Sequence, residues 1–142
     1  MNLPLQSQLI KNEIRDVDSR GEILSIVDTK ISNVSLITCN KGTIRSNHYH
    51  KKDFHFMYVL EGKIDYFYKS LTSNIINYLP VFAGDNIFTP KKEIHATFFP
   101  VKTTLIVSSG FKRDKITYES DTVRVKFIDH QNIKDMLLKY AK

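Results

Sequence analysis

Short runs of alternating apolar and polar residues, separated by turn-forming residues, occupy most of the chain. The runs EILSIVD, VSLITCN and KIDYFYKS are rich in β-branched and aromatic residues, and glycine or asparagine bounds them. The runs NIINYLPVF, NIFTP, HATFFP and TTLIVSS follow at close spacing with no helical period between them, and TVRVKFI has the pattern of a last strand. This pattern predicts an all-β fold, an antiparallel sandwich or barrel.

The two ends of the chain differ from this pattern. Residues 1–21 are polar and irregular, which predicts an N-terminal arm or edge strand that packs on another part of the protein. Near the C-terminus Asp129 is a candidate N-cap. Apolar residues then recur at helical spacing, namely Ile133, Met136, Leu137 and Tyr140. We therefore expect an arm over 1–21, a barrel over 22–128 and a C-terminal helix over 129–142.

Length and composition limit what this fold can be. With 142 residues, 42% of them hydrophobic, the chain suits one compact domain with a core. The start lacks the pattern of a secretory signal, and no apolar run approaches the roughly 20 residues that cross a bilayer. We therefore expect a cytoplasmic protein that does not bind membranes. Cys39 is the only cysteine, which excludes an internal disulfide and is typical of a small core side chain.

The net charge of +6 has two interpretations. Basic residues are scattered, with only short pairs at 51–52 and 91–92, and no arginine-rich helix or aromatic RNA-binding signature accompanies them. We therefore expect no nucleic-acid partner. The basic balance suits an anionic small molecule, such as a phosphorylated or nucleotide-linked compound, although a solvated surface is the commoner explanation.

Three histidines gather in the stretch from Gly42 to Gly62, GTIRSNHYHKKDFHFMYVLEG. His48 and His50 are two residues apart on a predicted strand, so their side chains point to the same face. The residues KKD predict a turn, and the strand that follows returns His55 beside the first pair. Imidazoles placed in this way can share a metal ion.

The spacing of these residues resembles the first motif of the cupins. That motif is Gly, five residues, His-x-His, three or four residues, Glu, six residues, Gly. It matches from Gly42 to Gly62, except that His55 stands where the family usually has glutamate.

The second cupin motif is Gly, five residues, Pro-x-Gly, two residues, His, three residues, Asn. It matches at Gly84, Pro90 and His95, while Lys92 replaces the second glycine and Phe99 the asparagine. The resemblance covers roughly residues 22–110 and implies a double-stranded β-helix, also called a jelly roll.

The resemblance also implies one divalent transition metal ion, Zn, Mn, Fe or Ni, held by His48, His50, His55 and His95. The fifth histidine, His130, is expected at the surface. A histidine in place of the glutamate leaves the ion's charge uncancelled, so the ion would be a stronger Lewis acid. Two alternatives remain open: the first pair can instead act as acid and base in a metal-free pocket, and His55 can point aside.

A narrower resemblance links the chain to cupins of bacterial surface-polysaccharide and deoxysugar biosynthesis. These have a D-x-R-G opening and a basic, asparagine-rich approach to His-x-His. The matching residues are Asp18, Arg20, Gly21, Arg45, Asn47 and Tyr49, with Ser46 where glycine is common. The resemblance implies a nucleotide sugar or related carbohydrate as substrate, and epimerisation or keto-isomerisation as the reaction.

Such a reaction removes a proton next to a ketone and must stabilise the resulting enolate. Tyr66 and Tyr68, predicted to face inward with Ile64, are candidates for moving the proton, and Arg45 for binding a phosphate or carboxylate. Barrel interiors also bury tyrosines for packing alone. By strand parity with the histidines, we expect three residues in the pocket wall, Met57, Val59 and Thr97.

The strand that carries His55 is apolar on its other face as well, at Phe54, Phe56, Tyr58 and Leu60. Because one sheet cannot cover both faces, the pattern predicts a homodimer packed across the outer face, with the N-terminal arm free to cross over.

Three classes of function fit the sequence. The first is a metal-dependent sugar isomerase or epimerase. The second is an Fe(II)-dependent dioxygenase, because an all-nitrogen site can also activate oxygen. The third is a binding module for a metal or sugar without catalytic activity, which the absence of a partner domain disfavours.

Overall fold

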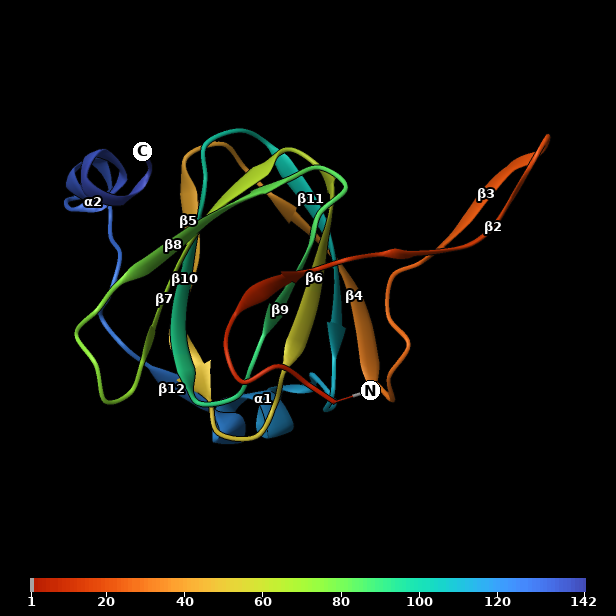
Figure 1. Ribbon diagram of the computed structural model, residues 1–142. Helices are drawn as coiled ribbons and strands as arrows, with labels where there is room; N and C mark the ends of the chain where they lie inside the picture. The colour runs from red at the N-terminus through yellow and green to blue at the C-terminus, as the bar shows by residue number, and fades with distance from the viewer. Residues whose placement is uncertain (1) are drawn as a thin grey trace.

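Two five-stranded antiparallel sheets face each other and form the body of the protein (Figure 1). The computed structural model describes residues 2–142. The first sheet has the strand order β1 (Gln8–Ile10), β9 (Asn86–Thr89), β6 (His55–Glu61), β11 (Thr103–Ser109) and β4 (Asn33–Cys39). The second has the order β12 (Thr122–Arg124), β5 (Thr43–His50), β10 (Glu93–Phe99), β7 (Lys63–Ser70) and β8 (Asn77–Phe82). The predicted all-β jelly roll is therefore confirmed.

The core lies between the two sheets. Ile64 and Tyr66 of β7 belong to one cluster with Val59 of β6 and Leu105 of β11, and each of the four is at most 2% exposed. Tyr68 packs at the edge of this cluster and is partly buried. Alternate residues of β7 thus point inward, as their sequence pattern predicts.

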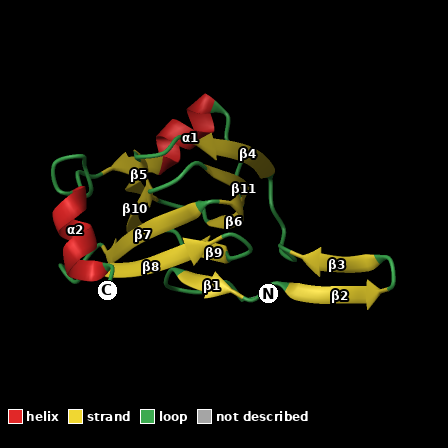
Figure 2. Ribbon diagram, turned by 90° about the horizontal axis from the view of Figure 1, so that it is seen from above, coloured by secondary structure: helices red, strands yellow, loops and turns green. Residues whose placement is uncertain are grey.

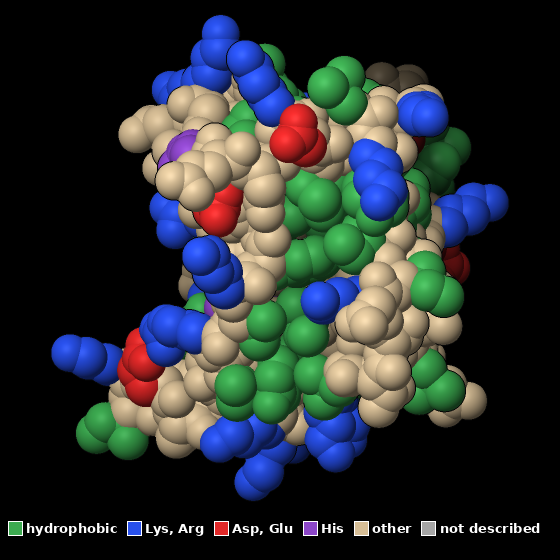
Figure 3. Space-filling model, turned by 90° about the vertical axis from the view of Figure 1, so that its left-hand side faces the viewer, with side chains coloured by type: hydrophobic (Ala, Val, Ile, Leu, Met, Phe, Trp, Pro, Cys, Tyr) green, Lys and Arg blue, Asp and Glu red, His purple; other side chains and the backbone are tan. Residues whose placement is uncertain are grey.

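A second apolar cluster lies on the outer face of the second sheet. Helix α2 (Ile133–Tyr140) contributes Ile133, which clusters with Phe67 of β7 and Ala96 of β10. Figure 3 shows this side of the molecule, where apolar side chains form a band between lysine and arginine side chains. The C-terminal segment thus supports the sheet that carries β5 and β10.

The start of α2 lies further along the chain than the sequence predicts. The N-cap is Asn132, and the first helical residue is Ile133. The carboxylate of Asp129 instead accepts hydrogen bonds from the backbone N–H groups of Gln131 and Asn132. Asp129 therefore closes the turn before the helix, which is a common role of aspartate outside an N-cap.

The predicted N-terminal arm divides into two parts. β1 pairs with β9 and forms an edge of the first sheet. β2 (Glu13–Asp18) and β3 (Gly21–Ser25) form a separate hairpin that projects away from the barrel (Figures 1 and 2). The strand predicted from residue 22 therefore lies in this hairpin and outside the barrel. The turn between the two strands is closed by the hydrogen bond from the Arg20 N–H to the Asp18 carboxylate.

Helix α1 (Lys115–Asp121) lies between β11 and β12, where the sequence predicts no helix. The Asp114 carboxylate accepts a hydrogen bond from the backbone N–H of Thr117, which caps the helix at its N-terminus. The helix buries none of its residues, so it lacks the apolar stripe by which helices are recognised. None of the helices described is long and apolar enough to cross a membrane.

The outer face of β6 is covered in part by the chain itself. Phe56 is 1% exposed and packs against Phe88 of β9 with ring centroids 5.0 Å apart, whereas Leu60 is 48% exposed. The sequence analysis assumed that only a second copy of the chain can cover this face. That assumption is wrong for Phe56, because Phe88 of the same chain covers it.

Cys39, at the end of β4, is 1% exposed and belongs to the core cluster. It is a free thiol, as its solitary place in the sequence requires. Burial is the main cause that raises its pKa.

Candidate active site

His48 and His50 lie at the end of β5, and His95 lies on the neighbouring strand β10, where it pairs with His48. Before the pair, Ser46 and Asn47 have positive φ values of 73° and 56°, and the register between β5 and β10 shifts there. This irregularity bends the strand and changes the direction in which the following side chains point, as a β-bulge does.

The side chain of Asn47 fixes this irregular segment to the C-terminal part of the chain. Its amide Nδ2 donates to the carbonyl oxygen of Ile128, and its Oδ1 accepts from the N–H of the same residue. In the sequence analysis, Asn47 belongs to the segment that precedes the two histidines. Its side chain thus positions the backbone from which they project.

Three imidazoles converge at this point. The ring centroids of His48 and His50 are 4.6 Å apart, and those of His48 and His95 are 4.8 Å apart. Each offers one nitrogen to a set whose members all lie within 4.8 Å of one another. All three side chains are buried. The structure thus brings together histidines from both sequence motifs.

His55 is adjacent to this set but does not join it. Its ring centroid lies 4.6 Å from that of His50. Its Nε2, however, lies 3.3 Å from the Oδ2 of Asp53 and 3.5 Å from the Nη1 of Arg113. The carboxylate engages this ring nitrogen, so the predicted fourth ligand points toward Asp53.

Burial keeps the converging imidazoles neutral. Burial, with a smaller contribution from the neighbouring histidines, lowers the pKa of His48 to about 3 and that of His50 to about 2. Burial also lowers the pKa of His95 well below its ordinary value. Each imidazole therefore carries one N–H and one free lone pair at neutral pH.

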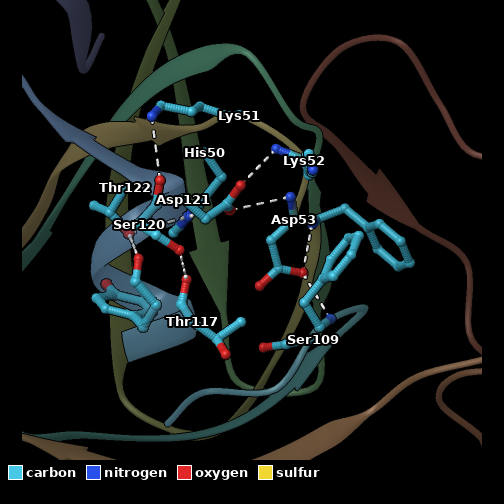
Figure 4. A network of polar contacts seen from close by, with 12 residues as sticks. His50, Lys51, Lys52, Asp53, Ser109, Thr117, Ser120, Asp121 and Thr122 are labelled. Carbon is cyan, nitrogen blue, oxygen red and sulfur yellow. Dashed lines mark hydrogen bonds and ion pairs between the residues drawn. The ribbon is translucent and has the colours of Figure 1, made fainter. Parts of the chain in front are cut away.

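Two carboxylates, which the sequence analysis did not predict as part of the site, lie next to the histidines. Asp121, the last residue of α1, lies 3.3 Å from the Nδ1 of His50 (Figure 4). Asp53 lies in the turn between β5 and β6, where its Oδ1 accepts from the N–H groups of Phe54 and Phe111. Only the turn character of Asp53 was visible in the sequence, and Asp121 lay in the unpredicted helix.

A cavity of about 110 Å³ opens beside the histidines. Its wall includes His48 and His55, while Arg113 and Tyr118 border it from the α1 side. The guanidinium of Arg113 lies over the ring of Tyr118 at 4.9 Å. The other lining residues are Ile37, Arg45, Ser46, Met57, Thr97, Phe99, Leu105 and Val107.

The predicted pocket residues separate into two groups. Arg45, Met57 and Thr97 line this cavity, whereas Val59 is fully buried in the core. Neither of the two predicted tyrosines lines it. The hydroxyl of Tyr66 is 2.7 Å from Ser7 Oγ and from Thr89 Oγ1, and Tyr68 borders a separate cavity.

A second, larger cavity shares a lining residue with the first. It has a volume of about 410 Å³, and Lys51, Lys52 and Lys112 are among its lining residues. Tyr118 belongs to the walls of both cavities. Three lysines and two carboxylates, those of Asp53 and Asp121, therefore border a cavity next to the histidines.

Comparison with known proteins reveals likeness in structure but not in sequence. No protein-family model matches the sequence, and no curated protein matches it. Among solved structures, QdtA, a sugar 3,4-ketoisomerase from Thermoanaerobacterium thermosaccharolyticum in complex with TDP, matches with a TM-score of 0.68 and 20% identity. The match covers 95% of this chain and 96% of QdtA.

Two further solved structures are similar. The TDP-quinovose 3,4-ketoisomerase WlaRB from Campylobacter jejuni has a TM-score of 0.70 and 15% identity, with 85% of this chain and 94% of that chain covered. The dTDP-4-dehydrorhamnose 3,5-epimerase from Sulfolobus tokodaii has a TM-score of 0.69 and 16% identity, with 91% and 83% covered. The protein therefore has the cupin jelly-roll fold, in the form that these nucleotide-sugar isomerases and epimerases share.

Proposed function

We propose that the protein is an isomerase or epimerase that acts on a nucleotide-linked sugar by proton transfer next to a carbonyl. The observation that carries the proposal is the set of neutral, buried imidazoles beside a cavity bordered by two arginines. The solved structures that are similar over most of their length are named as enzymes of this kind, and QdtA binds TDP.

In this proposal His48 is the base, because it lines the cavity and its imidazole is neutral. A base of low pKa in a buried site accepts a proton only while a negative charge forms beside it. The enolate oxygen supplies that charge, and Arg45 and Arg113 at the cavity stabilise it. In an isomerisation the proton then goes to the former carbonyl carbon, while the hydroxyl proton passes between the two oxygens. In an epimerisation it returns to the opposite face of the carbon that it left, so neither reaction consumes another reactant.

The two cavities divide the substrate between them. Binding sites for whole ligands usually measure about 300–1,000 Å³, so the cavity of about 110 Å³ is suited to the reacting part of the sugar alone. The phosphates of the nucleotide lie in the larger cavity, near Lys51, Lys52 and Lys112. Tyr118 separates the two parts.

A divalent transition metal ion fits the same three imidazoles, and we propose it as the alternative to base catalysis by His48, because the ion would occupy the lone pair of that residue. His48, His50 and His95 would hold it, since three neutral imidazoles are ligands that such ions prefer and the Nε2 of His50 is buried with no hydrogen-bond partner among residues 2–142. When bound, the ion would supply a Lewis acid for the carbonyl oxygen. His55 lies outside this set.

The assembly proposed is a homodimer. The β2–β3 hairpin projects from the barrel (Figure 2), and Ile14, Val17 and Ile23 on it are 51–67% exposed. An isolated two-stranded hairpin is marginally stable in water. A second copy that packs on these apolar side chains would stabilise the hairpin.

Deuterium exchange tests the proposed reaction. The protein is incubated in heavy water with a panel of nucleotide-linked 4-keto sugars, and we expect deuterium at the carbon next to the carbonyl. The His48→Asn variant should lose this exchange. If the folded wild-type protein exchanges no member of the panel, the proposal is wrong, and oxygen consumption by the Fe(II)-loaded protein would favour the dioxygenase instead.

A further inference from the structure

The carboxylate of Asp121 joins the end of α1 to the turn after β5 (Figure 4). Its Oδ1 accepts from the N–H of Lys52 at 2.8 Å, and its Oδ2 accepts from the N–H of Asp53 at 3.2 Å. The N–H of Lys51 donates to the backbone carbonyl of Asp121 at 2.9 Å. These bonds hold the carboxylate in one orientation, with its Oδ2 3.3 Å from the Nδ1 of His50.

The same ring nitrogen meets a second acceptor. The Oγ1 of Thr122 lies 3.4 Å from the Nδ1 of His50. That hydroxyl donates its own hydrogen to the carbonyl oxygen of Tyr118 at 2.7 Å, so toward the imidazole it can only accept. An ionised carboxylate likewise only accepts. Two acceptors around Nδ1 place the hydrogen of the neutral ring on Nδ1 and leave Nε2 with a lone pair.

The other ring nitrogen of His50 has an unusual environment for a buried polar atom. Its Nε2 is buried and has no hydrogen-bond partner among the residues that the structure describes. His95 is oriented by the same principle, because its Nδ1 lies 3.1 Å from the carbonyl oxygen of Glu93. Two members of the histidine set thus have an acceptor at Nδ1, which leaves each Nε2 free.

We propose that Asp121, with Thr122 beside it, is a positioning residue that fixes His50 as the Nδ1-protonated tautomer and so offers its Nε2 lone pair to the histidine set. The opposite tautomer would present an N–H group there, which can accept neither a proton nor an ion. The effect on catalysis rests on the proposed function, whereas the tautomer itself does not.

The substitution Asp121→Asn distinguishes this role from simple packing, because it keeps the shape and replaces one oxygen by an NH₂ group. If the NH₂ group takes the place of Oδ2, it donates to the Nδ1 of His50 and moves the ring hydrogen to Nε2. The alternative orientation places NH₂ against the N–H of Lys52, which is the shorter of the two backbone contacts. We therefore expect the tautomer to invert.

Asp114→Ala is the matched control. It removes the N-terminal cap of the same helix, since Asp114 accepts from the N–H of Thr117. It therefore loosens α1 but leaves the acceptors around His50 in place. A purely structural role of Asp121 would give both variants the same phenotype.

The experiment is ¹⁵N NMR of the imidazole nitrogens in the full-length, metal-free protein at neutral pH, with His50 assigned from the spectrum of His50→Asn. We expect an N–H shift for Nδ1 and a bare-nitrogen shift for Nε2 in the wild type and in Asp114→Ala, and the reverse in Asp121→Asn. With a nucleotide sugar that is turned over, kcat of Asp121→Asn should fall by about 10- to 100-fold, the usual effect of losing the group that orients a histidine of the site, with KM little changed.

Two results would overturn the inference: a wild-type His50 that carries its hydrogen on Nε2, or nitrogen shifts that stay unchanged in Asp121→Asn. If no nucleotide sugar is turned over, the proposed function is wrong, but the NMR result still decides the tautomer.

Discussion

The ring of Tyr66 lies parallel to the imidazole of His95, with centroids 6.2 Å apart and planes 10° apart. Tyr66 therefore supports His95 from the side of the core. Its hydroxyl contacts Ser7 Oγ and Thr89 Oγ1, and Ser7 Oγ in turn donates to the carboxylate of Glu93. This buried network joins the residue before β1 to the strand that carries His95.

The variant Tyr66→Phe should lower stability but preserve activity. It leaves the ring against His95 and removes a hydroxyl that two buried groups contact, so the free energy of unfolding should fall by about 1–3 kcal/mol. Urea denaturation and the isomerase assay measure the two effects. A fall in kcat without a loss of stability would instead assign proton transfer to Tyr66.

The stability of the metal-free protein should decrease as the pH falls below about 6.5. The folded-state pKa values of His48 and His50, about 3 and about 2, lie below the unfolded value. The unfolded chain therefore binds protons that the folded protein does not, and the loss continues down to these folded pKa values. The slope should approach about 1.4 kcal/mol per pH unit for each such histidine.

Urea denaturation at a series of pH values checks this slope. His50→Asn should reduce it, whereas His130→Gln, at an exposed position, should leave it unchanged. An equal slope in all three proteins would contradict the assignment to the buried histidines.

Removal of either cavity arginine should slow the reaction. In Arg45→Ala and Arg113→Ala we expect kcat and kcat/KM for the nucleotide sugar to fall about tenfold or more, since a charge-assisted hydrogen bond to the enolate oxygen contributes about 1.5–3 kcal/mol in the transition state. Steady-state kinetics measure the change. Lys102→Ala, an exposed position that removes the same charge, is the control and should keep the wild-type kcat and KM. An effect of equal size in the control would show that only the overall charge matters.

Metal retention should depend on three histidines rather than four. We expect His50→Ala and His95→Ala to lose a bound transition metal, and His55→Ala to retain it, because the Nε2 of His55 is engaged by Asp53. Elemental analysis of protein purified without an affinity tag gives the stoichiometry. Full retention in His50→Ala would refute the proposed site, and loss in His55→Ala would restore the fourth ligand.

The hairpin should control assembly. Replacing Ile14 and Ile23 by glutamate places charges on its apolar surface, and we expect the dimer to dissociate. Light scattering coupled to gel filtration gives the mass. Leu138→Glu, at an exposed position of α2, is the matched control. A monomeric wild-type protein at micromolar concentration would remove the basis of this prediction.

The barrel could be predicted because its strands alternate and its glycines stand at sterically constrained positions. Gly62, which ends the first motif, has φ of 94°, and a side chain there would overlap the side chain of Thr103 and the carbonyl of Lys102. Such a constraint preserves a residue type at a fixed spacing, so it is visible in a sequence. The convergence of His48 and His95 follows from the same spacing.

The features that the sequence analysis did not predict also have physical explanations. α1 has seven residues and buries none of them, so no periodic pattern marked Tyr118 or Asp121 as part of the site. The direction of His55 depends on the carboxylate of Asp53, two residues away on a turn, which spacing alone does not reveal. The hydroxyl partners of Tyr66 come from residues that are distant in the sequence.

The burial of Cys39 makes its thiol a natural probe for local unfolding of β4. Its thiol is the only one present, lies at the end of β4 opposite Thr103 of β11, and is shielded from solvent. Because alkylating reagents need an accessible thiolate, modification of the native protein must wait until β4 separates from the barrel. The alkylation rate in a mild denaturant would therefore measure how often this edge of the sheet detaches, without any added label.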